Sequence, residues 1–431
     1  MSSIIDSGAT SIEEMVRALR NVAPDVAYSF QDTAKAPIET VKTKSVFQQT
    51  HPKVQLAKST ITIQSRAKSG VRIFSAIFVL TVALGLSGLV YGNRAYLPEM
   101  YADTGMEPAA EAHAQGLNYQ VFDLNLNVRA LRDAQLAHMT KTPEIILYGA
   151  SQYQEAHADL FGGRNFYNMH IHRDYWEDLP GMVELMARHN RLPKILIVAV
   201  RDKQFTPVDL RKDWLWEPGI PAYRAATLRL GIETESWWKT APWHRIQALI
   251  SLPMLIDNFS RWQQAPQHPG PTTLKRTETM DLILPDGSIE WSNRKLMQLF
   301  TRQRTINEVN SYAQNSLNKP PVIDPKGVEA WEATFKFLKS KGVQVYLTNP
   351  TFNPEFYDQI AGTPYEEGFA RIVTQTQNFS KEFGFPIFGS ANPHEIGCVA
   401  EEYIDAEHAH PSCMEKVFAK FFTVEKQTAG N

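Results

Sequence analysis

A serine in the first half of the chain and an acid–histidine pair near its end have the types and spacing needed for catalysis. Ser151 stands in YGASQ, just after the apolar run Glu144–Tyr148. Asp405 and His408 stand three positions apart in YIDAEHAHPSC. A carboxylate can orient an imidazole as a base, and the imidazole can take the proton of a serine hydroxyl. We therefore expect Ser151 as nucleophile, His408 as base and Asp405 as the residue that orients the base.

Short apolar runs alternate with helical segments around these residues. We expect strands at Glu144–Tyr148, Lys194–Val200, Val343–Leu347 and Pro386–Phe388, with helices at Val128–Met139, Asp178–Asn190, Val328–Lys341 and Glu366–Phe383. Strands that are apolar on both faces and alternate with helices are typical of a parallel sheet covered on both sides, an α/β fold. Ligand sites of such sheets lie at the carboxyl ends of the strands. Ser151 follows such an end, where free backbone N–H groups at a helix start would suit an oxyanion.

The segments that carry these residues resemble the SGNH (GDSL-like) hydrolase family, in particular its membrane-anchored, extracytoplasmic branch associated with polysaccharide O-acylation. IILYGAS is similar to the first family block, which places the nucleophile at Ser151. DAEHAHP is similar to the last block, Asp-x-x-His-Leu-Asn-Pro, and the position of Pro411 then favours His408 over His410 as base. VYLTNPTFNPEFYD resembles a segment common in polysaccharide-associated members. The resemblance covers about residues 143–425, apart from an insertion at about 204–320, and implies a three-layer, flavodoxin-like parallel sheet.

Two middle blocks depart from the family pattern. The second block has a glycine that donates to the oxyanion, but the similar stretch FYNMHIHRDY has none. The third block offers Gly-x-Asn-Asp, whereas this strand runs into Val200-Arg201-Asp202-Lys203. The resemblance leaves Arg201, Asn168 and His170 as candidates for binding the oxyanion or substrate. Losing one oxyanion donor costs about 10²–10³ in turnover, so the residues also fit an inherited fold that has lost catalysis.

The segment Ile73–Gly92 predicts a membrane-spanning helix. It carries no charge, and at 1.5 Å per residue its length is about 30 Å, the thickness of a bilayer core. The alternative, a buried helix of a soluble protein, would normally show a polar stripe. The twenty residues before the segment contain Lys and Arg but no acid, and in the twenty-odd residues after it four acids outnumber a single arginine. This bias predicts a cytoplasmic N-terminus and a C-terminal domain on the other side of the membrane. Together with the resemblance above, it implies a bacterial inner-membrane protein whose C-terminal domain is periplasmic or extracellular.

The two cysteines, Cys398 and Cys413, bracket the acid–histidine pair. They are too few for a disulfide-built scaffold. In an oxidising compartment, however, such thiols pair readily. We therefore expect a Cys398–Cys413 disulfide that closes a loop around Asp405 and His408.

The rest of the chain divides into a tail, a linker and an insertion. Residues 1–70 predict a largely disordered cytoplasmic tail, in which Ser11–Val22 is either a docking helix or a stretch without a role. After a transmembrane helix at 71–93, residues 94–142 predict a membrane-proximal linker and a helix. The α/β domain at 143–425 then contains an insertion at about 204–320.

The insertion holds seven of the nine tryptophans, which sets it apart from the α/β pattern. We expect it to be mainly helical, with a hairpin at Leu282–Trp291 that turns at Asp286-Gly287. Its tryptophans either form its own core or stack on sugar rings; the core interpretation is favoured.

Charge and histidine spacing exclude two classes of function. A net charge of −2 gives no general basis for binding nucleic acid. The pairs His170/His172 and His408/His410 have no third ligand at a recognisable spacing, so we expect no metal and no cofactor.

The primary hypothesis is an acyl esterase or O-acyltransferase that acts on an envelope polysaccharide or exopolysaccharide through Ser-His-Asp chemistry. Its expected partners are the bilayer, an acylated glycan and the envelope polysaccharide machinery. The alternative is a catalytically degenerate accessory protein of a polysaccharide synthesis or export complex. The altered middle blocks favour the alternative, and the intact Ser151 and Asp-x-x-His motif favours the enzyme.

Overall fold

The structure, a computed structural model, describes residues 59–96, 106–121, 128–206, 219–232, 250–252, 255–256, 270–299 and 301–429. By its contacts the chain divides into two units, Met1–Ser75 and Ala76–Asn431. The expected helix Ser11–Val22 lies outside the described residues. So do six of the tryptophans assigned to the insertion, namely Trp214, Trp216, Trp237, Trp238, Trp243 and Trp262.

Helix α2 (Ser59–Tyr96) contains the apolar segment expected from the sequence. Its stretch Ile73–Gly92 has a mean hydropathy of 2.4, and its apolar side chains are not buried against other parts of the chain. Among the described residues it is the one helical segment long and apolar enough to cross a bilayer. The described part of the chain therefore has one candidate membrane span.

A parallel five-stranded sheet forms the centre of the folded region. Its strands are β2 (Ile145–Ala150), β3 (Phe166–Ile171), β4 (Ile195–Ala199), β8 (Gln344–Thr348) and β9 (Ile387–Phe388), in the order β3-β2-β4-β8-β9. The four strands expected from the sequence are present, and a mixed α/β fold is confirmed. Strand β3 was not expected, and it lies at the edge beside β2, with His170 opposite Gly149.

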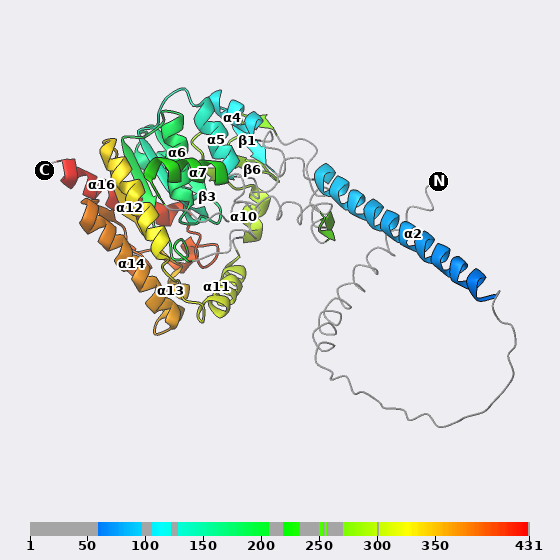
Figure 1. The fold of residues 1–431 in the computed structure, drawn as a ribbon. Helices are drawn as coiled ribbons and strands as arrows, with labels where there is room; N and C mark the ends of the chain where they lie inside the picture. The colour runs from blue at the N-terminus through cyan, green and yellow to red at the C-terminus, as the bar shows by residue number, and fades with distance from the viewer. Residues whose placement is uncertain are drawn as a thin grey trace. The chain divides into compact units, whose positions relative to one another are not determined.

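Helices cover both faces of this sheet (Figure 1). On one face, α6 (Asp178–Arg188), α12 (Pro325–Ser340) and α14 (Pro364–Phe383) pack on the alternate strand residues that include Tyr148 and Leu196. On the other face, α16 (Pro411–Ala429) packs on the strand residues between them, such as Leu147 and Ile197. Because both faces are buried, β2 and β4 are fully apolar, which is why the sequence reveals them.

Local sequence signals set where two of the covering helices begin. Asp324 accepts a hydrogen bond from the backbone N–H of Lys326 and caps α12, and Thr363 caps α14 in the same way. Each cap is followed by a proline. Proline suits the first turn of a helix because it lacks an N–H, and an N–H at that position would have no acceptor within the helix. At the other end of α14, Gly384 takes a left-handed conformation that ends the helix.

Residues 94–142, expected to hold a linker and a helix, contain the expected helix and also contribute a strand to a second, antiparallel sheet. Strand β1 (Asn118–Val121) pairs with β5 (Pro271–Thr272) on one side and with β6 (Asp281–Ile283) on the other. Helices α4 (Glu107–Ala114) and α5 (Val128–His138) pack against each other beside it. The described part of this region is therefore folded together with residues from the expected insertion.

In the described part of residues 204–320, helices account for most of the regular structure and short strands for the rest. This part contains helices α7 (Ile220–Leu230), α10 (Asn293–Leu299) and α11 (Arg302–Ser316), together with β5, β6 and β7 (Ile289–Glu290). Strands β6 and β7 form the expected hairpin, and Gly287 supplies its left-handed turn residue with φ of 80°. Trp291 is buried among Val121, Leu131 and Ile283, so this tryptophan is a core residue.

Candidate active site

Ser151 stands where the sequence predicts it, directly after the carboxyl end of β2. It is the first residue of the short helix η1 (Ser151–Tyr153). Gly149 allows the chain to approach this point closely, because a Cβ there would lie 2.9 Å from the Cβ of Ala199 on β4 and 3.2 Å from the ring of Tyr153. The small residue thus lets β2 and β4 pack closely just before the serine.

Asp405 and His408 lie in a tight loop between Tyr403 and Ala409, which form an antiparallel bridge. The backbone N–H of Ile404 donates to the carbonyl of His408 (3.1 Å). One oxygen of Asp405, Oδ1, accepts the backbone N–H groups of Glu407 and His408, each at 2.8 Å. These bonds fix the carboxylate within its own loop.

A disulfide between Cys398 and Cys413 closes the segment that carries this loop, as expected from the sequence. Both cysteines are buried against the sheet and α16. Cys398, Glu402 and Cys413 are the one group of three possible metal ligands among the described residues. Because both sulfurs are joined in the disulfide, neither is a thiolate that could bind an ion.

The structure brings the three predicted catalytic residues together. His408 Nε2 lies 2.9 Å from Ser151 Oγ, and His408 Nδ1 lies 2.8 Å from Asp405 Oδ2. Since a carboxylate only accepts, Nδ1 donates to Asp405 and Nε2 is free to accept the serine proton. The side chain of His408 is 23% exposed, so a substrate can reach the pair. The geometry is that of a Ser-His-Asp triad.

Charges around the triad favour a protonated histidine. Burial would lower the pKa of His408, but the charge of Asp405 and its hydrogen bond, followed by the charges of Glu407 and Glu155, raise it to about 9. Burial would raise the pKa of Asp405, but the charge and hydrogen bonds of His408 hold it below its usual value. Asp405 is therefore the ionised partner that stabilises an imidazolium.

Asn168, one candidate for binding the oxyanion, is used for structure. Its side-chain nitrogen donates to the carbonyl oxygens of Tyr153 (2.7 Å) and Ala156 (3.0 Å). Its side-chain oxygen accepts the backbone N–H of His170 (3.0 Å). The amide thus ties the loop after Ser151 to β3, which positions the loop and leaves no donor for a substrate.

His170 keeps an unused donor. Its Nδ1 lies 2.9 Å from Nη2 of the buried Arg132, and a guanidinium can only donate, so the proton of this ring is on Nε2. Burial, with the charge of Arg132, lowers the pKa of His170 far below its usual value and keeps the ring neutral. Its Nε2 is buried and has no hydrogen-bond partner among the described residues.

Arg201, the third candidate, is held by acids at the end of β4. Its Nη1 lies 3.3 Å from Asp174 and its Nε lies 3.6 Å from Asp202. Burial would lower the pKa of Arg201, but the charges of Asp202 and Asp174 raise it overall. The guanidinium is therefore a fixed cation. It lies beside the Asp405–His408 loop, because the charge of Glu407 in that loop also raises the pKa of Arg201.

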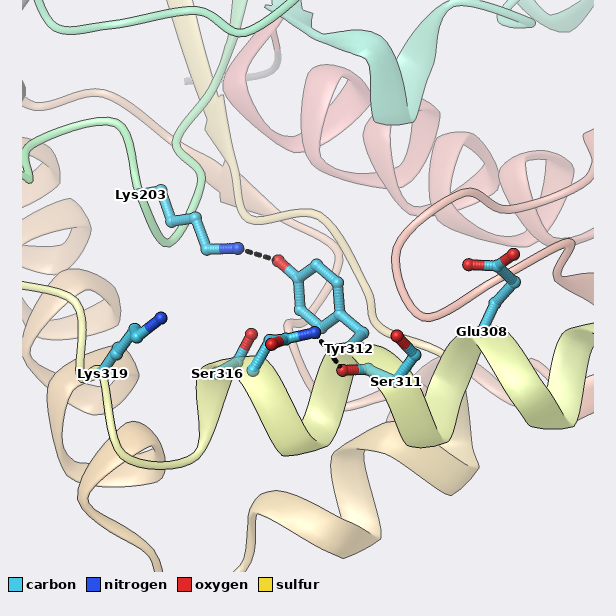
Figure 2. Close-up of a pocket in the computed structure, with 7 residues that line it drawn as sticks. Lys203, Glu308, Ser311, Tyr312, Ser316 and Lys319 are labelled. Carbon is cyan, nitrogen blue, oxygen red and sulfur yellow. Dashed lines mark hydrogen bonds between the residues drawn. The ribbon is translucent and has the colours of Figure 1, made fainter. Parts of the chain in front are cut away.

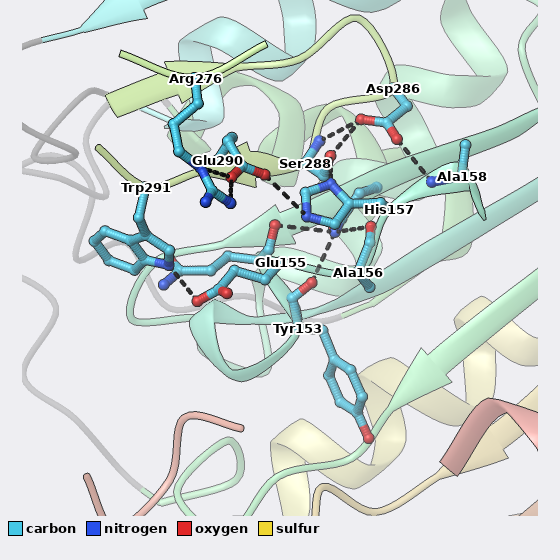
Figure 3. Close-up of polar contacts among 12 residues, drawn as sticks. Tyr153, Glu155, Ala156, His157, Ala158, Arg276, Asp286, Ser288, Glu290 and Trp291 are labelled. Atoms are coloured by element: carbon cyan, nitrogen blue, oxygen red, sulfur yellow. Dashed lines mark hydrogen bonds and ion pairs between the residues drawn. The ribbon is translucent and has the colours of Figure 1, made fainter. Parts of the chain in front are cut away.

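The sequence did not reveal that the hairpin contacts the loop after Ser151 (Figure 3). The backbone N–H of Ile289 donates to the carbonyl of Gln154 (2.8 Å), and Asp286 accepts the backbone N–H of Ala158 (2.8 Å). Trp291 Nε1 donates to the carboxylate of Glu155. Burial raises the pKa of Glu155 to about 7 despite that bond. Glu155 is therefore, with Asp405 and Glu407, one of three acids whose charges act on the pKa of His408.

His172 was also missed as a neighbour of the triad. Burial, followed by the charge of His408, lowers the pKa of His172 to about 3, so its ring is neutral. Its Nε2 is buried without a hydrogen-bond partner in the described part of the chain, and its ring meets that of His170 edge-on at 5.3 Å. The i, i+2 spacing of His170, on β3, and His172, just after its end, was the available signal, since in extended chain it places both rings on one face.

Comparison with known proteins adds no relative: no protein-family model and no curated protein matches this chain.

Proposed function

We propose that this chain is a membrane-anchored, SGNH-like acyl esterase or O-acyltransferase that acts on an envelope polysaccharide or exopolysaccharide. The observation that carries the proposal is the chain of two hydrogen bonds from Ser151 through His408 to Asp405, at 2.9 and 2.8 Å. A serine placed at the end of a parallel strand and bonded to a histidine with a carboxylate behind it fits acyl transfer. The helix at Ile73–Gly92 supports an envelope location.

The reaction follows from the positions of the atoms. His408 Nε2 takes the proton of Ser151 as Oγ attacks the ester carbonyl, and the imidazolium that forms is stabilised by Asp405. The imidazolium then gives its proton to the leaving sugar oxygen, which leaves an acyl group on Ser151. Water or a second sugar hydroxyl, deprotonated by His408, attacks this acyl group and restores the serine.

Stabilisation of the oxyanion rests on donors other than those of the family pattern. The backbone N–H of Ser151 stands at the start of η1, where a helix offers it no internal acceptor. The Nε2–H of His170 is unused on the neighbouring strand. We propose these two groups as donors to the oxyanion, with Arg201 as a nearby fixed cation.

The alternative is a non-catalytic accessory protein of a polysaccharide synthesis or export complex. It is favoured by the use of Asn168, whose amide binds three elements of its own chain and no substrate. It would leave the triad geometry without a role, and for that reason the enzyme is the better supported proposal.

Covalent labelling separates the two. The full chain in detergent should react with a serine-directed fluorophosphonate and should hydrolyse p-nitrophenyl acetate. Ser151→Ala should abolish both, whereas Ser340→Ala, which removes an exposed hydroxyl at the end of α12, should change neither. Equal labelling and equal hydrolysis by the wild type and Ser151→Ala would favour the accessory protein.

A further inference from the structure

A polar cavity lies along α11, apart from the triad residues themselves (Figure 2). Its volume is about 290 Å³, near the lower limit for small-molecule sites. The side chains that line it are almost all hydroxyl, amide or charged groups, and they include Lys203, Glu308, Ser311, Tyr312, Ser316 and Lys319. These groups can hydrogen-bond a ligand rich in hydroxyl groups, and the carbon stems of the same side chains offer its rings apolar contact.

Helix α11 connects this cavity to the Asp405–His408 loop. Positions 308, 311, 312, 315 and 316 recur at three or four residues and so share the face that lines the cavity. The other face buries Val309 and Ala313 in a core that includes Ala406, between the two catalytic residues of the loop. Thr305 also donates to the carbonyl of Tyr403 (3.4 Å). One rigid element therefore carries the cavity and supports the loop.

Lys203 makes a second connection. It belongs to the turn after β4 and donates to the hydroxyl of Tyr312, with its Nζ 4.1 Å from the centre of that ring. The same Nζ lies 3.7 Å from Glu407, the residue before His408. The Lys203–Glu407 contact thus links the cavity to the residue next to the catalytic histidine.

The charges in the cavity are unevenly placed. Figure 2 shows Lys203 and Lys319 at one end and Glu308 at the other. Lys319 is exposed, and no carboxylate lies within ion-pair distance of it in the described part of the chain. Lys319, together with Lys203, whose Nζ also lies beside Glu407, places positive charge next to a row of hydroxyls. Such an arrangement suits an anion that is part of a polyhydroxylated molecule.

We propose that this cavity is a subsite for a carboxylate-bearing sugar unit of the polymer. The carboxylate lies between Lys203 and Lys319, and Ser311, Ser316 and Glu308 contact the ring hydroxyls. The inference deepens the proposed function and rests on it for the nature of the polymer. It assigns that polymer to the acidic polysaccharides.

Binding of unacylated oligosaccharides tests the subsite without any turnover. The probes are oligomers of galacturonic and of glucuronic acid, their methyl esters, in which the carboxylate is neutral, and inorganic phosphate. Isothermal titration calorimetry with the full chain in detergent should show binding of an acidic oligomer, with at least fivefold weaker binding of its methyl ester and of phosphate alone. Binding should also weaken as salt is raised, because exposed charges are screened.

The variants Lys319→Gln and Lys336→Gln form a matched pair. Both change an exposed lysine, but Lys336 lies on α12, outside the cavity. Lys319→Gln should weaken binding of the acidic oligomer about fivefold, the effect of losing one exposed charge pair. Lys336→Gln should leave binding at the wild-type value.

The outcomes separate this inference from the proposed function. No binding of either acidic oligomer, equal affinity for the methyl esters or for phosphate alone, or wild-type affinity in Lys319→Gln would overturn the subsite. Loss of the proposed function would appear instead as absent Ser151 labelling in a protein that still binds the acidic oligomer.

Discussion

Asp405 contacts His408 at two of its atoms. Oδ2 lies 2.8 Å from ring Nδ1, and Oδ1 lies 2.8 Å from the backbone nitrogen of the same residue. The carboxylate therefore fixes both the ring and the peptide that carries it. This arrangement selects the tautomer with its proton on Nδ1, in which Nε2 faces Ser151 as an acceptor.

Asp405→Asn should abolish most activity without unfolding the protein. The amide oxygen can still accept the two backbone N–H groups, which turns the amide nitrogen toward Nδ1. Because that nitrogen donates, the ring must carry its proton on Nε2 and cannot accept from Ser151. We expect kcat for p-nitrophenyl acetate to fall about 10⁴-fold, the cost of the wrong tautomer in such a triad.

The control for this change is Asp358→Asn. Asp358 also contacts a histidine, His394, but both side chains of that pair are more than half exposed and neither contacts Ser151 or His408 through a hydrogen bond. It should keep wild-type kcat and the same melting temperature. A loss of activity in Asp358→Asn equal to that in Asp405→Asn would mean that the effect is not specific to the triad.

Activity should rise with pH. Burial would lower the pKa of His408, but the charge of Asp405 and its hydrogen bond raise it to about 9. Only the neutral ring accepts the serine proton, so kcat/KM should be low below this pKa, increase through it and level off above it. Glu155→Gln removes one of the negative charges that raise the pKa of His408, so the midpoint should move to lower pH. Glu382→Gln, an exposed acid on α14, should leave it in place.

The pH–rate profiles of the three proteins decide this prediction. A profile that is flat between pH 7 and 10, or a midpoint that Glu155→Gln moves upward, would contradict the assignment of His408 as the titrating base.

The triad could be predicted because its signals are local. Ser151 follows a strand that is apolar on both faces, and Asp405 and His408 lie three residues apart in one loop. Strand β3 was missed because Asn168 and His170 interrupt its apolar pattern, although both side chains are buried. Their burial is stabilised by bonds to Ala156 and Arg132, residues that the sequence gives no reason to place nearby.

The antiparallel sheet was missed for a related reason. Strand β1 has four residues, NYQV, with no clear alternation, and its partners lie more than 150 positions later. Such a strand is stabilised by its neighbours rather than by its own pattern. The contact of Trp291 with Glu155 depends on this long-range pairing, which is why the sequence pointed to the hairpin but not to what it contacts.

Removing the disulfide should lower stability and activity together. Cys398 and Cys413 close a loop of fifteen positions, for which the chain-entropy model gives about 3 kcal/mol. The double variant Cys398→Ala/Cys413→Ala should lose about this free energy of unfolding in urea. Its kcat should also fall, because the loop that positions His408 is less restrained. An unchanged free energy of unfolding in the double variant would show that the cross-link is not needed to hold the loop.

Gly149 and Gly181 offer a steric test of the site that positions Ser151. A methyl group at Gly149 would lie 2.9 Å from Ala199 Cβ and 3.2 Å from the ring of Tyr153, so β2 and β4 would have to separate. Overpacking of this kind costs about 1–3 kcal/mol. Gly149→Ala should therefore lower the free energy of unfolding by that amount and reduce kcat, because Ser151 would move relative to His408.

Gly181, inside α6, is the control position. A Cβ there would have its nearest atoms at 3.5 Å or more, and alanine favours a helix over glycine by about 1 kcal/mol. Gly181→Ala should keep kcat and match or exceed the wild type in stability; equal behaviour of the two variants would mean that close packing at Gly149 does not position the serine.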